Sequence, residues 1–201
     1  MHQDIIIQHY YNSFIISFKK KRVFLDIRYT MSFILLLFCM IMGLTYNINA
    51  FECYGSGSGL IIEYPNAIIT PNNSGQLLTE SQTTNEPNIT WNTNKGRYFH
   101  LIMIDPDAPS PTNPTYADYL HWFIINNINN IPSGYIEMEY KGPSPPQAIH
   151  RYCIFIYETH NQISYSKPIQ RNNFNETLFS QYINTQSGSL LSSTYFNVTS
   201  S

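Results

Sequence analysis

Residues 98–109 read YFHLIMIDPDAP, and this stretch decides the architecture that the rest of the chain must fit. Its first seven residues are nearly continuously apolar, as in a central strand that is covered on both faces. Asp105 ends the strand, and alternation of side chains places it on the face of Leu101 and Met103. His100 falls on the opposite face, which predicts a structural role for this histidine.

Short apolar runs recur on both sides of this stretch, between clusters of Pro, Gly, Asn and Ser that are typical of turns. Only residues 176–183 (ETLFSQYI) have a helical pattern, and a second helical turn is expected around 116–120. Many strands without long intervening helices favour a mainly β sandwich over a βαβ fold. The predicted strands lie at 60–64, 67–69, 88–91, 98–104, 121–126, 135–140, 151–157 and 193–198.

The composition supports one folded domain and argues against a nucleic-acid partner. A chain of 201 residues is long enough for one domain and a short accessory segment. Hydrophobic residues make up 43% of it and aromatic residues 15%, which is ample material for a core. From Phe51 onward six basic and eleven acidic side chains remain, a net charge of −5. A domain of this sign lacks the basic surface that nucleic acids require.

The first 50 residues have the pattern of a leader. Residues 33–44 (FILLLFCMIMGL) form an uncharged apolar run of the length found in secretory signal peptides, and Ala50 offers a small residue for cleavage. Residues 1–30 are either part of this leader or an extension upstream of a start at Met31. The alternative to cleavage is an uncleaved signal anchor, which would make the protein transmembrane. We expect a flexible lead-in at 51–59 and the folded domain at 60–198.

Four Asn-x-Ser/Thr acceptors and two cysteines bear on the compartment. Asn72, Asn88, Asn175 and Asn197 are candidate glycosylation sites, and with the leader they predict a secreted or lumenal glycoprotein. Cys53 and Cys153 have no metal-binding or redox spacing. Cys153 lies in an apolar strand and is most simply a buried thiol. The alternative is a disulfide to Cys53, which an oxidising compartment permits.

The chemistry concentrates in three segments. Residues 105–109 (DPDAP) place two carboxylates in a loop that its prolines make stiff, and His121 opens the next apolar strand. A Gly/Pro turn at 142–146 leads to His150 and Tyr152, which face the same way because they are two apart on a strand. A carboxylate beside an imidazole raises its pKa, and turn amides add donors, so these groups suit a phosphate-like anion. On spacing alone, acids that cap turns and histidines that bind carbonyls explain the pattern equally well.

Two long segments carry a family resemblance. Residues 99–126 (FHLIMIDPDAPSPTNPTYADYLHWFIIN) and 140–158 (YKGPSPPQAIHRYCIFIYE) resemble the DPDAPS and HRY signatures of the phosphatidylethanolamine-binding protein family. This family includes the Raf kinase inhibitor proteins and the plant flowering-time regulators. The resemblance spans about 60–198 and implies a Greek-key β-sandwich with a few short peripheral helices. It also implies a small pocket for phosphate, acetate or phospholipid head groups.

Carried over residue by residue, the resemblance assigns nine residues to the pocket. It implies a cis Ala108–Pro109 bond, and we assign Asp107 to holding the loop. Tyr119 stands where animal members carry Trp, and Ala148 replaces a usual Gly. The implied ligand-binding residues are Asp105, Ala108, Pro109, Tyr116, His121, Gly142, Pro145, His150 and Tyr152.

Three functions are compatible with these observations. The leading one is a secreted binding module for phosphate or phospholipid head groups. The second is an inhibitor of an extracellular or vacuolar peptidase that acts through protein contacts, as some relatives do. The third is a hydrolase that uses Asp105, His121 and His150. We disfavour it, because the sequence has no GxSxG, no HExxH and no usual metal-ligand spacing. We therefore expect no catalytic residues, no metal and no cofactor.

Overall fold

The computed structural model describes residues 53–93, 96–128, 134–166 and 170–200. The chain separates into residues Met1–Ala50 and Phe51–Ser201, and only the second unit contains described residues. The predictions of a leader, a cleavage site at Ala50 and a signal anchor therefore lie outside the described residues. No helix within the described ranges is long and apolar enough to cross a membrane.

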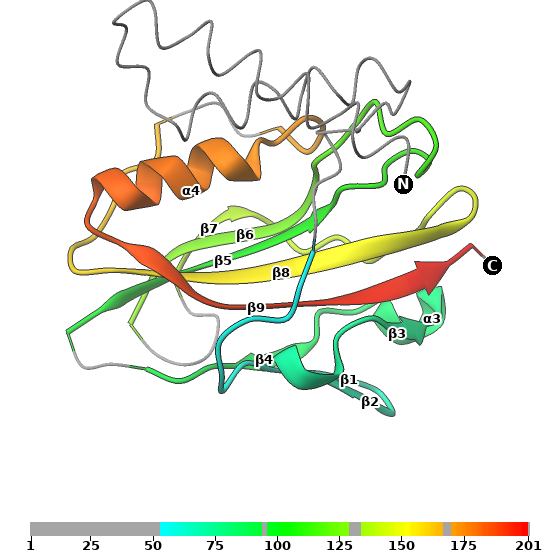
Figure 1. The fold of residues 1–201 in the computed structure, drawn as a ribbon, viewed down its shortest axis with the longest axis horizontal. Coiled ribbons are helices and arrows are strands. Elements are labelled where there is room, and N and C mark those ends of the chain that lie inside the picture. Colours follow the sequence, from blue (N-terminus) through cyan, green and yellow to red (C-terminus); the bar gives the residue numbers. More distant parts are fainter. Residues whose placement is uncertain (1–52, 94–95, 129–133, 167–169, 201) are drawn as a thin grey trace, which may run out of the picture. The chain divides into compact units, whose positions relative to one another are not determined.

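Two β-sheets form the layers of the domain (Figure 1). The smaller sheet has the order β2-β1-β4, and the larger has the order β3-β9-β8-β5-β6-β7. The strands are β1 (Ile61–Tyr64), β2 (Ala67–Ile69), β3 (Gln76–Leu78), β4 (Asn88–Thr90), β5 (Tyr98–Asp105), β6 (Tyr119–Asn127), β7 (Tyr135–Met138), β8 (Ile149–Thr159) and β9 (Ser189–Thr199).

The larger sheet is a Greek key. Strands β5, β6 and β7 follow one another as antiparallel neighbours, and β8 returns to pair with β5 on its other side. Strand β9 then pairs antiparallel with β8, and the short β3 adds to β9 in parallel. The mainly β sandwich predicted from the sequence is confirmed.

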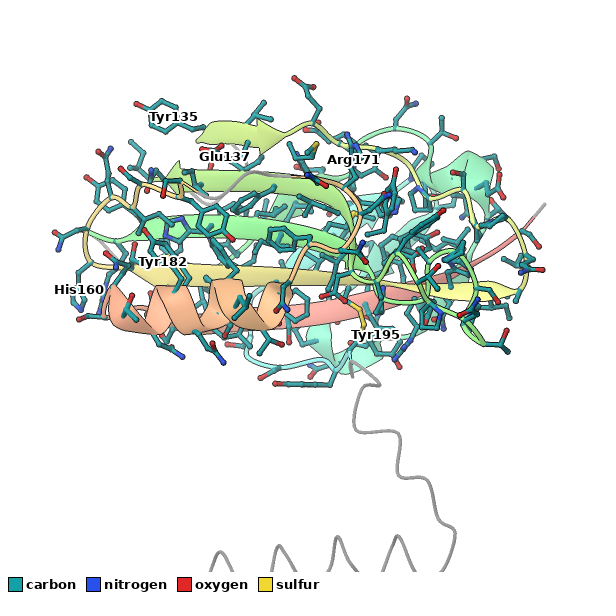
Figure 2. The ribbon with its side chains drawn as sticks, turned by 90° about the horizontal axis from the view of Figure 1, so that it is seen from above. Tyr135, Glu137, His160, Arg171, Tyr182 and Tyr195 are labelled. Atoms are coloured by element: carbon teal, nitrogen blue, oxygen red, sulfur yellow. A yellow bond between two sulfur atoms is a disulfide. The ribbon has the colours of Figure 1, made fainter. Side chains whose placement is uncertain are left out.

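The helices are short and lie around the sheets. They are the 3-10 turn η1 (Pro71–Asn73), α3 (Glu80–Thr83) and α4 (Glu176–Thr185). Helix α4 begins where the Asn175 side chain accepts a hydrogen bond from the Leu178 amide, and it buries Phe179 and Ile183. Figures 1 and 2 show α4 lying across one face of the larger sheet.

Side-chain alternation along the central strands divides the core into two clusters. Leu101, Met103 and Tyr152 belong to the cluster between the two sheets, whereas Ile102 and Phe155 belong to the cluster beneath α4. Asp105 therefore lies on the face that the sequence predicted for it, shared with Leu101 and Met103. Every residue of β5 after Tyr98 is buried, as expected for a strand covered on both faces.

One local prediction is wrong, and two short elements of the structure were not predicted. Residues 116–120 do not form a helical turn, because the Asp118 and Leu120 amides bond to the carbonyls of Phe174 and Arg171 instead of to their own segment. The sequence reading missed β3, which has only two apolar residues. It also missed α3, which begins with a capping box between Thr79 and Gln82.

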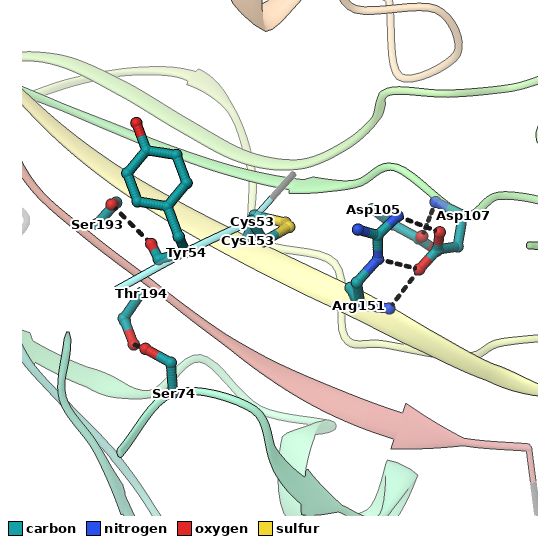
Figure 3. The surroundings of a disulfide bond; sticks show 9 residues. All are labelled: Cys53, Tyr54, Ser74, Asp105, Asp107, Arg151, Cys153, Ser193 and Thr194. Atoms are coloured by element: carbon teal, nitrogen blue, oxygen red, sulfur yellow. Dashed lines mark hydrogen bonds and ion pairs between the residues drawn. A yellow bond between two sulfur atoms is a disulfide. The ribbon is translucent and has the colours of Figure 1, made fainter. Parts of the chain in front are cut away.

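Cys153 is not a free thiol. It forms a disulfide with Cys53, and the two Cα atoms are 5.7 Å apart (Figure 3). The pairing is possible because the lead-in segment runs beside β9, where the amide and carbonyl of Ser56 both bond to Ser193. The Ser193 hydroxyl also donates to the Tyr54 carbonyl at 2.8 Å. A segment whose glycines and serines predict flexibility is thus held at Cys53, Tyr54 and Ser56.

Candidate functional site

The centre of the site is a buried ion pair at the end of β5. Asp105 is 3% exposed and His150, on the neighbouring β8, is 0% exposed. The Asp105 Oδ2 atom lies 2.8 Å from His150 Nδ1, and its Oδ1 atom accepts the Asp107 amide at 2.8 Å. Both oxygens of this carboxylate are therefore engaged, which fixes the orientation of the imidazole ring.

Electrostatics favour a charged His150. Burial lowers the pKa of His150, but its hydrogen bond to Asp105 and the negative charge of that carboxylate outweigh burial, so the pKa is raised overall. Burial raises the pKa of Asp105, and the contact with His150 opposes this rise. An imidazolium held by a carboxylate can donate its second N–H to an anion.

That second N–H faces an open cavity. The buried Nε2 atom of His150 has no hydrogen-bond partner of normal geometry among the described residues, although the Gln147 carbonyl lies near enough to contribute to the raised pKa of the ring. His150 lines a cavity of about 160 Å³ at the end of the sandwich. Seven predicted site residues meet there: Asp105, Ala108, Pro109, Tyr116, His121, His150 and Tyr152.

The second histidine of the cavity has different chemistry. His121 occupies a bulge in β6, since Met103 and Ile104 of β5 pair with Trp122 and Leu120 and skip it. Its Nδ1 atom lies 2.6 Å from the Lys141 carbonyl oxygen, so Nδ1 carries the proton. Burial lowers the pKa of His121 to about 4. His121 is therefore neutral at pH 7, and only His150 has the carboxylate that the sequence argument required.

Asp107 supports the loop, as expected from the sequence. Its Oδ2 atom accepts the Arg151 backbone amide at 2.8 Å and Arg151 Nε at 2.9 Å, and its Oδ1 atom accepts Nη2 at 2.7 Å (Figure 3). This bidentate contact ties the loop after β5 to β8. The Ala108–Pro109 bond is cis, as the resemblance implied. The Ala108 carbonyl accepts the Tyr116 amide at 3.0 Å, which closes the same loop.

Two predicted residues do not line the cavity. A Cβ atom on Gly142 would come within 2.8 Å of the Thr83 carbonyl and 2.9 Å of the Thr84 carbonyl, so this glycine permits a close approach to α3. Pro145 is buried, and its neighbours Ser144 and Pro146 line the cavity in its place. In a turn with three prolines, the sequence does not tell which residue faces the ligand space.

Tyr119 and Lys141 also line the cavity, although neither is among the nine residues that the resemblance assigns to it. Lys141 Nζ donates to the Tyr119 hydroxyl at 2.8 Å and lies 5.0 Å from the centroid of its ring. Tyr119 could have been found because it stands where animal members carry Trp, whereas for Lys141 the only available signal was a basic residue directly before the Gly/Pro turn. A single exposed lysine in such a position carries little information by itself.

Arg171 stabilises the backbone around His121 without lining the cavity itself. Its Nη1 atom donates to the carbonyls of Leu120 and His121 at 2.9 and 3.2 Å, and Nη2 donates to the Glu139 carbonyl at 2.9 Å. Figure 2 shows Arg171 beside the strands of the larger sheet. Because its partners among the described residues are carbonyl oxygens, no pattern of side chains in the sequence could have revealed this role.

The comparison with protein families decides the identity of the fold. The model of the family described as "Phosphatidylethanolamine-binding protein" matches residues 68–195. The chain belongs to this family. The match covers β2 through most of β9 and includes both of the segments that meet at the cavity.

Named relatives agree with this membership. The chain is 33% identical over 114 residues to the rice protein MOTHER of FT and TFL1 homolog 2, a match that covers 54% of this chain and 66% of that protein. The carboxypeptidase Y inhibitor, solved in complex with its cognate proteinase, superposes with a TM-score of 0.59 at 21% identity. That match covers 81% of this chain and 93% of the inhibitor.

A phosphatidylethanolamine-binding protein from Plasmodium vivax has a TM-score of 0.56 at 18% identity, with 80% of this chain and 93% of that chain covered. At these identities the two solved structures show a shared fold, and what each protein binds is a property of that protein.

A second cavity, of about 240 Å³, lies beside the N-terminus of α4. It is larger than the Asp105–His150 cavity, but none of its lining residues is charged, and they are mostly Asn and aromatic side chains. It lacks a buried, unpartnered donor of the kind that His150 offers. The smaller cavity is therefore the better candidate site of this family member.

Proposed function

We propose that this chain is a binding protein whose cavity receives a phosphate or a phospholipid head group. The observation that carries the proposal is the buried Asp105–His150 pair, whose free Nε2–H faces the cavity. A charge-assisted hydrogen bond from this group suits a phosphoryl oxygen. Family membership supports the same class of ligand.

A binding role explains the site better than hydrolysis. Within the ranges that the structure describes, neither cavity histidine forms a hydrogen bond with a hydroxyl or thiol that could act as a nucleophile: His150 binds a carboxylate and His121 binds a carbonyl. Cys153, the thiol nearest in sequence to His150, is in the disulfide. A phosphodiesterase and esterase screen tests this part of the proposal, and turnover that requires His150 would contradict it.

The test of binding is a thermal shift on the full chain expressed through a eukaryotic secretory pathway. Phosphate or phosphoethanolamine at ten times Kd should raise the Tm by about 3–6 °C, because a ligand that binds only the folded state stabilises it by mass action. Chloride at matched ionic strength is the control. The proposal fails if the wild-type protein shows no gain.

The matched variants remove the donor of the cavity. His150→Ala should abolish the gain in Tm, and an equal gain would contradict the proposed site. This change leaves the Asp105 charge buried without its cationic partner, which costs stability. The double variant Asp105→Asn/His150→Gln removes both charges together and provides a folded reference if the single variant does not fold.

We also propose that the protein is secreted and glycosylated. The disulfide supports an oxidising compartment. Asn72, Asn88 and Asn175 are exposed, whereas Asn197 is half-buried and donates to the Gly75 carbonyl at 2.9 Å. Intact mass measurement of protein from the medium, before and after glycan removal, should show cleavage near Ala50. It should also show higher glycan occupancy at the three exposed sites than at Asn197. Retention in the membrane with an intact N-terminus would favour the anchor.

The alternative function is inhibition of an extracellular or vacuolar peptidase. It is favoured by the shared fold with the carboxypeptidase Y inhibitor, at 21% identity. An inhibition assay against serine carboxypeptidases distinguishes it from the head-group proposal, because His150→Ala should leave inhibition through protein contacts unchanged.

A further inference from the structure

Lys141 stands at the mouth of the cavity on a backbone that is fixed from both sides. Its amide donates to the His121 carbonyl at 2.9 Å, and its own carbonyl accepts from His121 Nδ1 at 2.6 Å. These two bonds hold the lysine Cα against the bulge of β6 whatever its side chain does. The side chain is exposed and reaches Tyr119, whose hydroxyl and ring it contacts.

The charge of Lys141 is available to a ligand. Among the described residues it forms no ion pair, whereas Arg151 is bound by Asp107 and Arg171 by three carbonyls. Asp105 and protonated His150 together carry no net charge, so the net positive charge of the cavity comes from Lys141. In a domain with a net charge of −5 this local cation decides whether a doubly charged anion is attracted.

Phosphoryl ligands differ in the features that these groups detect. A phosphomonoester has a second pKa of about 6, so at neutral pH it carries nearly two negative charges and three terminal oxygens. A phosphodiester carries one charge and two free oxygens, and it needs room for a second substituent. A monoester can accept from His150 Nε2–H at the floor and Lys141 Nζ at the mouth and still offer a third oxygen to Tyr119 or Tyr152.

We propose that Lys141 makes the cavity selective for a terminal, dianionic phosphoryl group over an internal phosphodiester. This inference rests on the proposed function and assigns its ligand class. The lysine exchanges its neutral partner, the Tyr119 hydroxyl, for a charged oxygen, and its flexible stem can move while its backbone stays in place. The Tyr119 ring remains beside the stem in both positions.

The experiment is calorimetric titration of the full secreted chain at pH 7.5 with phosphoethanolamine and with glycerophosphoethanolamine, its diester counterpart. The wild type should bind the monoester about tenfold more tightly, as expected for one extra charge interacting with a partly exposed cation. Lys141→Met keeps the apolar stem and should remove this preference by weakening only the monoester. Lys141→Arg should keep most of the preference.

A matched control separates a local effect from a change in net charge. Arg97→Met removes the same charge at the start of β5, roughly 25 Å from Asp105 along the strand, and should leave the preference unchanged. Equal affinities in the wild type, or a preference that persists in Lys141→Met, would overturn the inference while leaving the proposed function in place. No binding of either ligand to the wild type would overturn both.

Vesicles identify the source of the phosphoryl group. Binding to vesicles that contain phosphatidic acid, but not to those with only phosphatidylethanolamine, indicates a lipid monoester. Binding of inorganic phosphate and phosphoethanolamine without vesicle binding indicates a soluble source. Both patterns support the inference, and preferential binding to the phosphatidylethanolamine vesicles contradicts it.

Discussion

Each end of β5 lies beside a buried histidine and a bulge in β6. The two ends differ in whether a ring nitrogen of that histidine is left to face a cavity. Each end has a buried histidine, His100 or His150, and each lies beside a bulge in β6, at Asn126 or at His121. Both histidines are 0% exposed and both sit on central strands of the larger sheet. Burial and position therefore do not distinguish them.

At the His100 end every polar atom of the ring is satisfied. Its Nδ1 atom accepts the Asn126 amide at 3.2 Å, and Nε2 lies 2.9 Å from the Thr159 hydroxyl, which donates on to the Asn161 carbonyl. Burial lowers the pKa of His100 to about 4, so the ring is a neutral part of the core. His150 instead has a carboxylate on one nitrogen and the cavity on the other. A buried histidine becomes a receptor when its second nitrogen is left to a ligand.

We call the His100 end of β5 the closed end and the Asp105–His150 end, with its cavity, the open end. The largest effect on stability should come from the closed end. His100→Leu leaves the Asn126 amide without its acceptor and should lower the free energy of unfolding by about 2–4 kcal/mol. Urea denaturation measures this loss. The Kd for phosphoethanolamine should stay within about twofold, because the cavity lies roughly 17 Å away along the strand. A loss of binding without a loss of stability would reverse the roles we give to the two histidines.

At the open end the corresponding change is Asp105→Asn. The asparagine oxygen can still accept the Asp107 amide, but the charge that holds His150 protonated is gone. We expect affinity for phosphoethanolamine at pH 7 to fall by about tenfold to a hundredfold, or roughly 1.4–2.8 kcal/mol. Calorimetry measures the affinity, and an NMR titration should show a lower His150 pKa. Unchanged affinity with a lowered pKa would mean that imidazolium charge is not required.

The pH dependence should be confined to the open end. Because the pKa of His150 is raised, its proton is present below that pKa and is lost as pH rises through it, and affinity should fall with it. His121 is already neutral over this range. Glycerophosphoethanolamine is the probe, since its diester does not titrate there. A flat affinity between pH 6 and 9 would contradict a titrating His150.

The bulges can be compared in the same way. Arg171 fixes the His121 bulge, and the Asn126 bulge is fixed by a two-way bond, in which the Asn126 side chain exchanges hydrogen bonds of 2.9 Å with Ile163. Arg171→Met should weaken phosphoethanolamine binding by about threefold to tenfold and cost about 1–2 kcal/mol of stability. Asn126→Ala should cost more stability, about 2–4 kcal/mol, because it loses both bonds to Ile163 and places alanine at a φ of 58°, and it should leave binding unchanged. Equal effects of the two variants on binding would remove the distinction.

Sequence reading succeeded where a periodicity carried the information. Alternation placed Asp105 on the Leu101 face, put His100 on the opposite face, and predicted that His150 and Tyr152 face the same way. Alternation could not show that His150 is charged and His121 neutral. Their hydrogen-bond partners, a carboxylate for His150 and a carbonyl for His121, are brought to them only by the fold. Long-range contacts were also out of reach, as for the Cys53–Cys153 disulfide and for Gly142 against α3.

Ala148, near the open end, has a backbone conformation that is unfavourable for alanine. Ala148, which replaces a usual Gly, has a φ of 63°, and Asn126 at the closed end has a φ of 58°. Asparagine tolerates the left-handed region, whereas alanine is penalised there by about 1–2 kcal/mol.

Ala148→Gly should therefore raise the free energy of unfolding by about 1 kcal/mol, since the greater freedom of glycine in the unfolded chain offsets part of the relief. Urea denaturation measures the change, and Asn126→Gly, which also loses the bonds to Ile163, should lower stability instead. A loss of stability in both variants would mean that Ala148 makes contacts that outweigh its backbone conformation. Because Ala148 lies two residues before His150, a gain in stability with weaker phosphoethanolamine binding would show that the open end requires the shape that alanine imposes.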